Sequence, residues 1–407
     1  MLDVMSSILD ERLLDRTTEH ARAYLRALPE RHVGATATRE ELISALRVPL
    51  SESGEDPAAV IDALAAQGAR GTMASAGPRY FGFVIGGSLP VALSADWLTS
   101  TWDQNPGIYA TSPLISAIED VAREWVLDLF DLPRQSGVGF VTGCQMAHFT
   151  CLAAARHHLL RRNGWNVEED GLAGAPRIHV VTSAESHITV DVALRYLGFG
   201  TRSQLRVESD SQGRMRADRL RRLLDNIHGP TIVCAQAGNV NTGSFDPLAE
   251  IAAAAREHGA WLHVDGAFGL WVRASRELRH LAAGAELADS WATDAHKWLN
   301  VPYDNGLAIV RHADDHRASM TATAAYLVQT SGVERAAVDW VPEFSRRGRG
   351  VTVYAALRAL GRAGVADLID RCCARARQMV AILDRDSRVE ILGDVVLNQV
   401  LVRFGGD

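Results

Sequence analysis

Short β-like runs alternate with helical segments between residues 114 and 310, and this alternation restricts the possible folds more than any other feature of the sequence. The apolar periodicity predicts helices at 114–129, 146–162, 189–197, 217–226 and 247–257. The β-like runs lie at 138–141, 177–182, 205–207, 231–235, 260–264, 289–292 and 306–310. Strands that alternate with helices in this way predict an α/β fold, with a mostly parallel sheet covered by helices on both faces.

The regions on either side of this alternation differ from it. Residues 1–75 are mainly helical, with amphipathic stripes but little core of their own, so we expect them to cover a surface of the main body or of a partner subunit. Residues 311–407 are Arg-rich and end in β-like runs at 389–392 and 396–404, which predicts a small α+β domain. The predicted organisation is a helical dimerisation segment (1–75), a large domain (76–310) and a small C-terminal domain (311–407). We expect the last to be incomplete, because the chain stops directly after a strand.

The composition limits the class of protein. With 47% hydrophobic and 22% charged residues, the 407-residue chain is typical of a globular protein. Its formal net charge of −7 argues against a nucleic-acid binder, and its five cysteines form no CxxC pair, which favours a reducing compartment. The N-terminus lacks the order of a signal peptide, and no apolar run reaches the ~18–20 residues needed to span a bilayer. We therefore expect a cytoplasmic enzyme without nucleic-acid or membrane partners.

Two residues at predicted strand ends give the strongest chemical signal. Asp265 closes an apolar run, and Lys297 follows the run at 289–292. Because the carboxyl ends of parallel strands converge on the ligand crevice, we expect both side chains at one site. Apolar neighbours of Lys297 would desolvate its amine and lower its pKa toward that needed for a Schiff base, and Asp265 could keep a pyridine nitrogen protonated. The simpler interpretation is a structural Lys–Asp ion pair.

Two further motifs follow predicted strands. Gly143, Cys144 and Gln145 form a turn between a strand and a helix, where free backbone N–H groups favour a phosphate. His187 comes directly after the strand at 177–182 and adds a flat ring that could stack on another ring. Each signal is weak by itself, since many such turns contain glycine and most loop histidines are surface residues.

In this order the motifs resemble those of the pyridoxal-phosphate-dependent group II amino-acid decarboxylases, the family of aromatic-amino-acid, glutamate and histidine decarboxylases. The resemblance runs from about residue 80 to the C-terminus. Its most specific parts are His263-Val264-Asp265-Gly266-Ala267-Phe268-Gly269 and Asp294-Ala295-His296-Lys297-Trp298. It implies the aspartate-aminotransferase-like fold type I, pyridoxal 5′-phosphate (PLP) as cofactor, and a homodimer with shared active sites.

The resemblance also implies a role for each matching residue. Lys297 would form the Schiff base with the cofactor, Asp265 would pair with its ring nitrogen, and His187 would stack on its ring and act in catalysis. The other implied cofactor-binding residues are Gly143, Cys144, Gln145 and His296 at the phosphate, Ala267 against the ring, Thr242, and Asp294, which stands where the family often has Asn. Tyr80, Phe83, Trp102 and Tyr109 fall where the family lines its substrate pocket, although a role as core aromatics fits them equally well.

These roles predict a lyase of carboxylic acid and amino-acid metabolism that decarboxylates an L-amino acid. The aromatic residues between 80 and 109 slightly favour an aromatic or apolar side chain on the substrate. Proton return to Cα is in doubt, because the family's mobile loop contains a Tyr and the corresponding residues 327–353 contain none, although Tyr326 and Tyr354 flank them. Family members that lack this Tyr can release aldehyde instead of amine.

Several alternatives stay open at this point. The chain could be a decarboxylation-dependent aldehyde synthase, another fold type I lyase or an aminotransferase, which differ in product. A non-catalytic cofactor-binding protein is disfavoured by the joint presence of the three catalytic candidates. A metal site at His258, His263 and Asp265 is weaker, because no third ligand follows at helical spacing, and we predict no metal.

Overall fold

The computed structural model describes residues 10–321 and 334–405, and the chain divides into two compact units, residues 1–87 and 88–407. The first unit contains α2 (Glu11–Ala27), α3 (Arg39–Leu46) and α4 (Pro57–Gly71). Helix α4 begins with Pro57, and the side chain of its N-cap Asp56 accepts the Ala59 N–H. Among the described residues of both units, no helix is long and apolar enough to cross a membrane.

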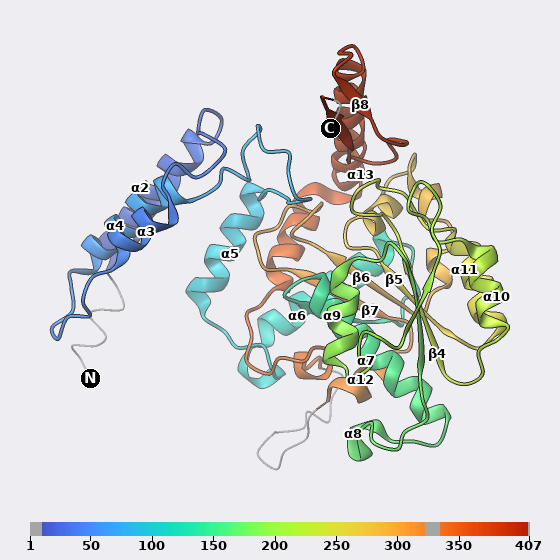
Figure 1. Ribbon diagram of the computed structural model, residues 1–407. Helices are drawn as coiled ribbons and strands as arrows, with labels where there is room; N and C mark the ends of the chain where they lie inside the picture. The colour runs from blue at the N-terminus through green and yellow to red at the C-terminus, as the bar shows by residue number, and fades with distance from the viewer. Residues whose placement is uncertain (1–9, 322–333, 406–407) are drawn as a thin grey trace. The chain divides into compact units, whose positions relative to one another are not determined.

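A seven-stranded sheet forms the centre of the second unit (Figure 1). In spatial order its strands are β1 (Gly137–Val141), β7 (Gly306–Val310), β6 (Ser290–Asp294), β5 (Trp261–Asp265), β4 (Thr231–Gln236), β2 (His179–Ser183) and β3 (Gln204–Val207). The strands from β6 to β3 pair in parallel, whereas β7 is antiparallel to its neighbours β6 and β1. The predicted α/β fold with a mostly parallel sheet is confirmed.

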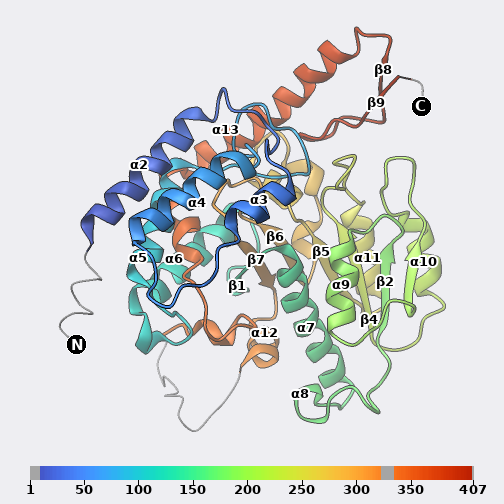
Figure 2. The same ribbon diagram turned by 60° about the vertical axis from the view of Figure 1, so that its left-hand side comes forward.

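Helices cover both faces of this sheet. Figure 2 shows α7 (Cys144–Arg162) and α9 (Ile188–Tyr196) packed together over one face, and α10 (Ala217–Leu224) and α11 (Leu248–Glu257) packed together over the other. Every residue of β1, β5, β6 and β7 is buried, as expected for strands covered on two sides. The remaining α-helices of this unit are α5 (Pro90–Trp102), α6 (Pro113–Leu129), α8 (Val167–Asp170), α12 (Ala313–Met320) and α13 (Gly350–Leu383).

The C-terminal part of this unit is built on α13, which packs against α5 and α6 and is interrupted by non-helical backbone at Gly361. After α13, β8 (Val389–Ile391) and β9 (Val402–Phe404) form an antiparallel pair. The predicted run at 396–404 is therefore a strand only over its last three residues. Just before this strand Leu401 O accepts the Leu392 N–H at 2.8 Å, and Leu397 is fully buried.

Candidate active site

The carboxyl ends of β1, β2, β4, β5 and β6 surround a cavity of about 330 Å³. Ligands of open α/β sheets bind outside this edge, because side chains from several strand ends meet there. The cavity is lined by Thr142, Gly143, Cys144, Gln145, Met146, His187, Thr189, Gln236, Gly238, Val240, Asp265, Ala267, Phe268, Asp294, His296 and Lys297. It therefore brings together the three residues predicted for catalysis, although they are far apart in the sequence.

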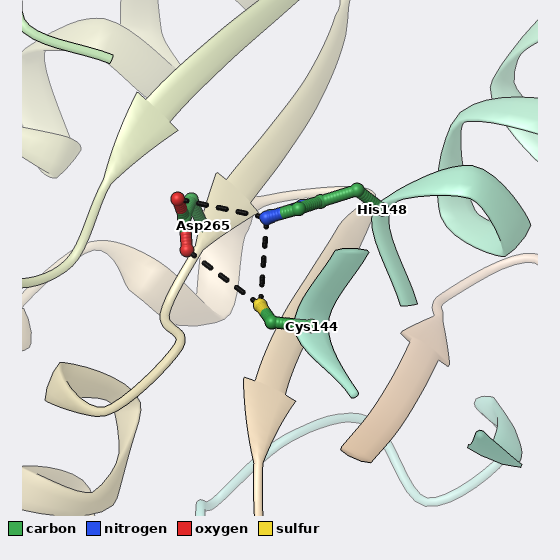
Figure 3. Close-up of side chains that lie close together, drawn as sticks. All are labelled: Cys144, His148 and Asp265. Atoms are coloured by element: carbon green, nitrogen blue, oxygen red, sulfur yellow. Dashed lines mark hydrogen bonds and ion pairs between the residues drawn. The ribbon is translucent and has the colours of Figure 1, made fainter. Parts of the chain in front are cut away.

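Asp265 ends β5 and is only 6% exposed. Its Oδ1 accepts the Ala267 N–H at 3.1 Å and lies 3.8 Å from Cys144 Sγ, while its Oδ2 lies 3.6 Å from His148 Nε2. Figure 3 shows Cys144 and His148, both from α7, facing this carboxylate. These contacts fix the position of the Asp265 carboxylate, which is therefore suited to hold a cationic partner in the cavity.

Lys297 is paired with a different carboxylate. Its Nζ lies 3.1 Å from Asp294 Oδ2 and 5.9 Å from the centre of the Phe268 ring. Burial lowers the pKa of Lys297, but attraction to Asp294 and to other nearby acidic groups outweighs burial, so the pKa is raised above its ordinary 10.5. The lowered pKa expected from the apolar neighbours in the sequence is therefore wrong, because that expectation left out Asp294.

Asp294 also meets the first turn of α7. Its Oδ1 accepts the Cys144 N–H at 2.6 Å and lies 3.4 Å from His296 Nε2, so a carboxylate stands where the helix dipole favours an anion. The adjoining turn requires glycine for space: a Cβ on Gly143 would lie 3.1 Å from His296 Cε1, and one on Gly306 would lie 2.6 Å from the Gly143 backbone. Burial lowers the pKa of His296, with Asp294 opposing the change.

His187 is the N-cap of α9 and lines the cavity wall. Its Nδ1 accepts the backbone N–H of Thr189 at 3.4 Å and lies 2.8 Å from the Thr189 hydroxyl. With Nδ1 acting as acceptor, the neutral ring has its proton on Nε2. The cap therefore fixes both the orientation and the tautomer of the ring that the sequence placed at this edge.

Five of the residues predicted from the resemblance are not among those that line this cavity in the described chain. Thr242 instead hydrogen-bonds Gln212 O and Ser244 Oγ. Trp102 ends α5 and Tyr109 begins a short 3-10 turn, and neither contributes to the lining. Tyr80 and Phe83 belong to the first unit, where Phe83 is 89% exposed.

Sequence reasoning also missed several residues of the site. Val240, Met146 and Thr189 add an apolar and hydroxyl lining that received no role from the sequence, and Phe268 lay in a quoted motif but was given no role. His148 follows Cys144 by four residues on a helix, and this spacing, which places both on one face, was the available signal. The weaker metal alternative does not correspond to the contacts found, because His258 bonds Asp225 whereas His263 bonds His148 and Ser290.

Two tyrosines, Tyr326 and Tyr354, flank the loop without tyrosine, and the structure describes only Tyr354. Tyr354 lies in α13, where its ring stacks on Trp125 at 4.9 Å and its hydroxyl accepts from Arg358, and it does not line the cavity in the described chain. Tyr326 lies outside the described residues, as do residues 327–333 of the loop. Proton return by Tyr354 within its own subunit therefore has no support in the geometry.

Comparisons with known proteins identify relatives of this chain. The acidic amino acid decarboxylase GADL1 of Mus musculus is 30% identical over 311 residues, which are 74% of this chain and 56% of that protein. The aromatic-L-amino-acid decarboxylase of Bacillus atrophaeus is 26% identical over 94% of this chain and 78% of that protein. This chain spans less than two thirds of the length of the GADL1 relatives, at 56 to 66%.

Solved structures show the same fold. The structure of Oryza sativa TDC with PLP and tryptamine matches with a TM-score of 0.89 at 24% identity, over 97% of this chain and 83% of that one. Mouse CSAD matches with a TM-score of 0.88 at 24% identity, over the same shares. The family model described as the pyridoxal-dependent decarboxylase conserved domain matches residues 41–404. The chain thus belongs to the pyridoxal-dependent decarboxylase family.

Proposed function

We propose that this chain binds PLP at Lys297 and decarboxylates an L-amino acid with an aromatic or apolar side chain to the amine and CO2. The observation that carries the proposal is the single cavity that contains His187, Asp265 and Lys297. The donor set fits PLP: a primary amine, a buried carboxylate and the backbone N–H groups at the start of the 19-residue helix α7. When bound, PLP supplies an aldehyde for Schiff-base formation and a ring that withdraws electrons from Cα.

The proposal gives each predicted site residue in the cavity a separate role. Lys297 would hold the cofactor through its amine. Asp265 would pair with the ring nitrogen, and His187 would lie against the ring from the cavity wall. The turn at Gly143, Cys144 and Gln145, with His296, would bind the phosphate. Proton return to Cα falls to a group that can reach the cavity, and His187, which lines it, is our candidate for this role.

The lining supports an apolar rather than an acidic substrate. Phe268, Val240 and Met146 contribute apolar surface to the cavity. Among the described residues that line the cavity none is an arginine, and Lys297 is already ion-paired with Asp294. A substrate with a side-chain carboxylate would therefore find no dedicated cation in this part of the chain, although the GADL1 relatives are acidic amino acid decarboxylases.

A screen of the amino acids for CO2 release tests this proposal. We expect release from aromatic or large apolar L-amino acids and little from aspartate, glutamate or cysteine sulfinate. Release confined to acidic substrates would overturn the substrate class, and the absence of both PLP binding and CO2 release would overturn the reaction. Amine, aldehyde and dioxygen are measured in the same samples.

A second candidate is aldehyde formation, which the sequence of residues 327–353 favours because it contains no tyrosine. In that reaction the amino acid, dioxygen and water give aldehyde, CO2, ammonia and hydrogen peroxide, and dioxygen takes up the two electrons. We expect dioxygen uptake to approach CO2 release if proton return to Cα is slow. Rapid amine formation without dioxygen uptake would exclude this candidate.

Asp294 provides a prediction about cofactor loading. Replacing Asp294 by Asn removes the charge that raises the pKa of Lys297 and that competes with phosphate for the Cys144 N–H. Because the Lys297 pKa then falls, more of its amine is free at neutral pH, and one pKa unit corresponds to a roughly tenfold gain in free amine. We expect faster PLP uptake and a profile of uptake against pH that moves to lower pH. An unchanged profile, measured by the visible absorbance, would contradict this role.

We also propose a homodimer with shared active sites, located in the cytoplasm. The three helices α2, α3 and α4 contain no buried residue, and Leu14 and Leu64 are 67% and 55% exposed. All five cysteines are unpaired, which supports a reducing compartment. We expect light scattering to give twice the chain mass, and Leu14→Asp to shift the protein toward monomer, whereas Leu172→Asp in the second unit serves as the control. A fully active monomer would contradict the proposal.

A further inference from the structure

A row of buried polar side chains lies behind Asp265, and the proposed function does not use it. Trp261 Nε1 lies 2.9 Å from Ser290 Oγ, Ser290 Oγ lies 2.9 Å from His263 Nδ1, and His263 Nε2 lies 2.9 Å from His148 Nδ1. All four side chains are at most 2% exposed. Burying this many polar groups is costly unless each is hydrogen-bonded, and here each one is.

The chemistry of the groups fixes the direction of these hydrogen bonds. The indole of Trp261 can only donate, so Ser290 Oγ accepts from it. The single hydroxyl proton of Ser290 then has one remaining partner among the described residues, His263 Nδ1, and leaving it unpaired would incur a desolvation penalty. His263 therefore has its proton on Nε2 and donates to His148 Nδ1. His148 in turn has its proton on Nε2, at the end of the row that faces Asp265.

At the end of the row His148 lies beside both Cys144 and the Asp265 carboxylate, as Figure 3 shows. His148 Nε2 lies 3.4 Å from Cys144 Sγ and 3.6 Å from Asp265 Oδ2. Burial raises the pKa of the Cys144 thiol well above its usual value, so the thiol keeps its proton and can donate to Asp265 Oδ1 at 3.8 Å. Burial also lowers the pKa of His148 and of His263 to about 3, so both rings are neutral.

We propose that Trp261, Ser290, His263 and His148 are positioning residues that hold the Nε2–H of His148 toward Asp265, and that this contact orients the Asp265 carboxylate toward the ring nitrogen of PLP. The physical reason is that a donor held in a fixed direction restricts how the carboxylate can turn. The inference rests on the proposed function for the identity of the ring. It extends that function to four side chains that do not line the cavity. Cys144, which contacts His148 and Asp265, does line it.

The first test reads the tautomers directly in the unmodified protein. Nitrogen-15 labelling of histidine, with His148→Gln and His263→Gln for assignment, reports which ring nitrogen has the proton. We expect both histidines to be neutral with the proton on Nε2 near neutral pH. A proton on Nδ1 of His148, or a charged ring, would overturn the proposal. So would a stoichiometric transition metal bound to Cys144, His148 and Asp265, whose ligand atoms lie within 4.8 Å of one another.

The second test measures the effect on bound PLP without substrate, through the nitrogen-15 chemical shift of its labelled ring nitrogen and its dissociation constant. We expect His148→Leu to move the shift toward the unprotonated value and to weaken binding about tenfold, the effect of losing one polar contact that orients a charged group. His148→Gln restores a donor near the same position and should recover most of the loss. Asp265→Asn removes the carboxylate charge itself and gives the largest change in nitrogen-15 shift and PLP binding expected at this position.

Two further variants separate positioning from general stability. Ser290→Ala removes the hydroxyl that sets the direction of the hydrogen bonds in the row. His263, His148 and Asp265 lie between Ser290 and the ring nitrogen, so the variant should shift the nitrogen-15 signal in the same sense as His148→Leu but by less. His316→Leu is the matched control, because His316 is also fully buried and bonds Trp340 O instead of this row. A response to Asp265→Asn with none to His148→Leu and Ser290→Ala would overturn the proposal. Since no substrate is added, a failed amino-acid screen is a separate result.

Discussion

Lys297→Ala is expected to lose decarboxylation by about 10³-fold or more, because it removes both the covalent attachment point and the amine that returns the cofactor to its resting position. Lys297 is the only lysine among the 407 residues, so the variant has no other side-chain amine that could substitute. We therefore expect purified Lys297→Ala protein to lack the yellow colour that the parent protein shows after incubation with PLP.

The single lysine also simplifies the measurement. Borohydride reduction of the parent protein should add one pyridoxyl phosphate per chain, visible in the mass of the intact protein. The only other primary amine is the N-terminus, which α-amino labelling reports separately. Lys297→Arg is the matched control, since it preserves the charge opposite Asp294 and hence the fold while forming no Schiff base. Stoichiometric labelling of the Lys297→Arg protein would contradict the assignment.

Arg346→Met should lower the free energy of unfolding by about 3–5 kcal/mol, the effect of leaving a buried charge without its partner. The Arg346 side chain is 0% exposed and makes two hydrogen bonds to Glu119, at 2.7 and 3.0 Å, and a third to Phe140 O at 3.0 Å. Phe140 lies in β1, shortly before the turn at Gly143, so the ion pair supports the strand that leads into the turn proposed to bind the phosphate.

Two variants make this prediction specific. The double variant Glu119→Leu with Arg346→Met removes both charges and should recover much of the loss, because no unpaired charge then remains. Arg371→Met breaks an exposed ion pair with Asp367, in which the side chains are 60% and 61% exposed, and should change stability by about 1 kcal/mol or less. Urea unfolding measures all three, and a loss for Arg346→Met no larger than for Arg371→Met would contradict the prediction.

The sequence by itself determined the sheet and the residues at its carboxyl edge. Apolar runs of three to six residues between amphipathic helices predict a mostly parallel sheet, since both properties are local and repeat along the chain. The same local order places Asp265 at the end of a strand, His187 four residues beyond another and Lys297 three residues beyond a third, and the carboxyl ends of parallel strands meet at one edge. The predicted edge was therefore right without knowledge of any long-range contact.

Only the tertiary structure decided how charge and protons are arranged at that edge. The pKa of Lys297 depends on the balance between burial and Asp294, and a sequence does not give the 3.1 Å distance that sets this balance. His148 and His263 are 115 positions apart, and their contact exists because α7 lies across the face of β5. Hydrogen bonds and ion pairs depend on ångström distances between residues remote in sequence, whereas periodicity records only which side of an element faces the core.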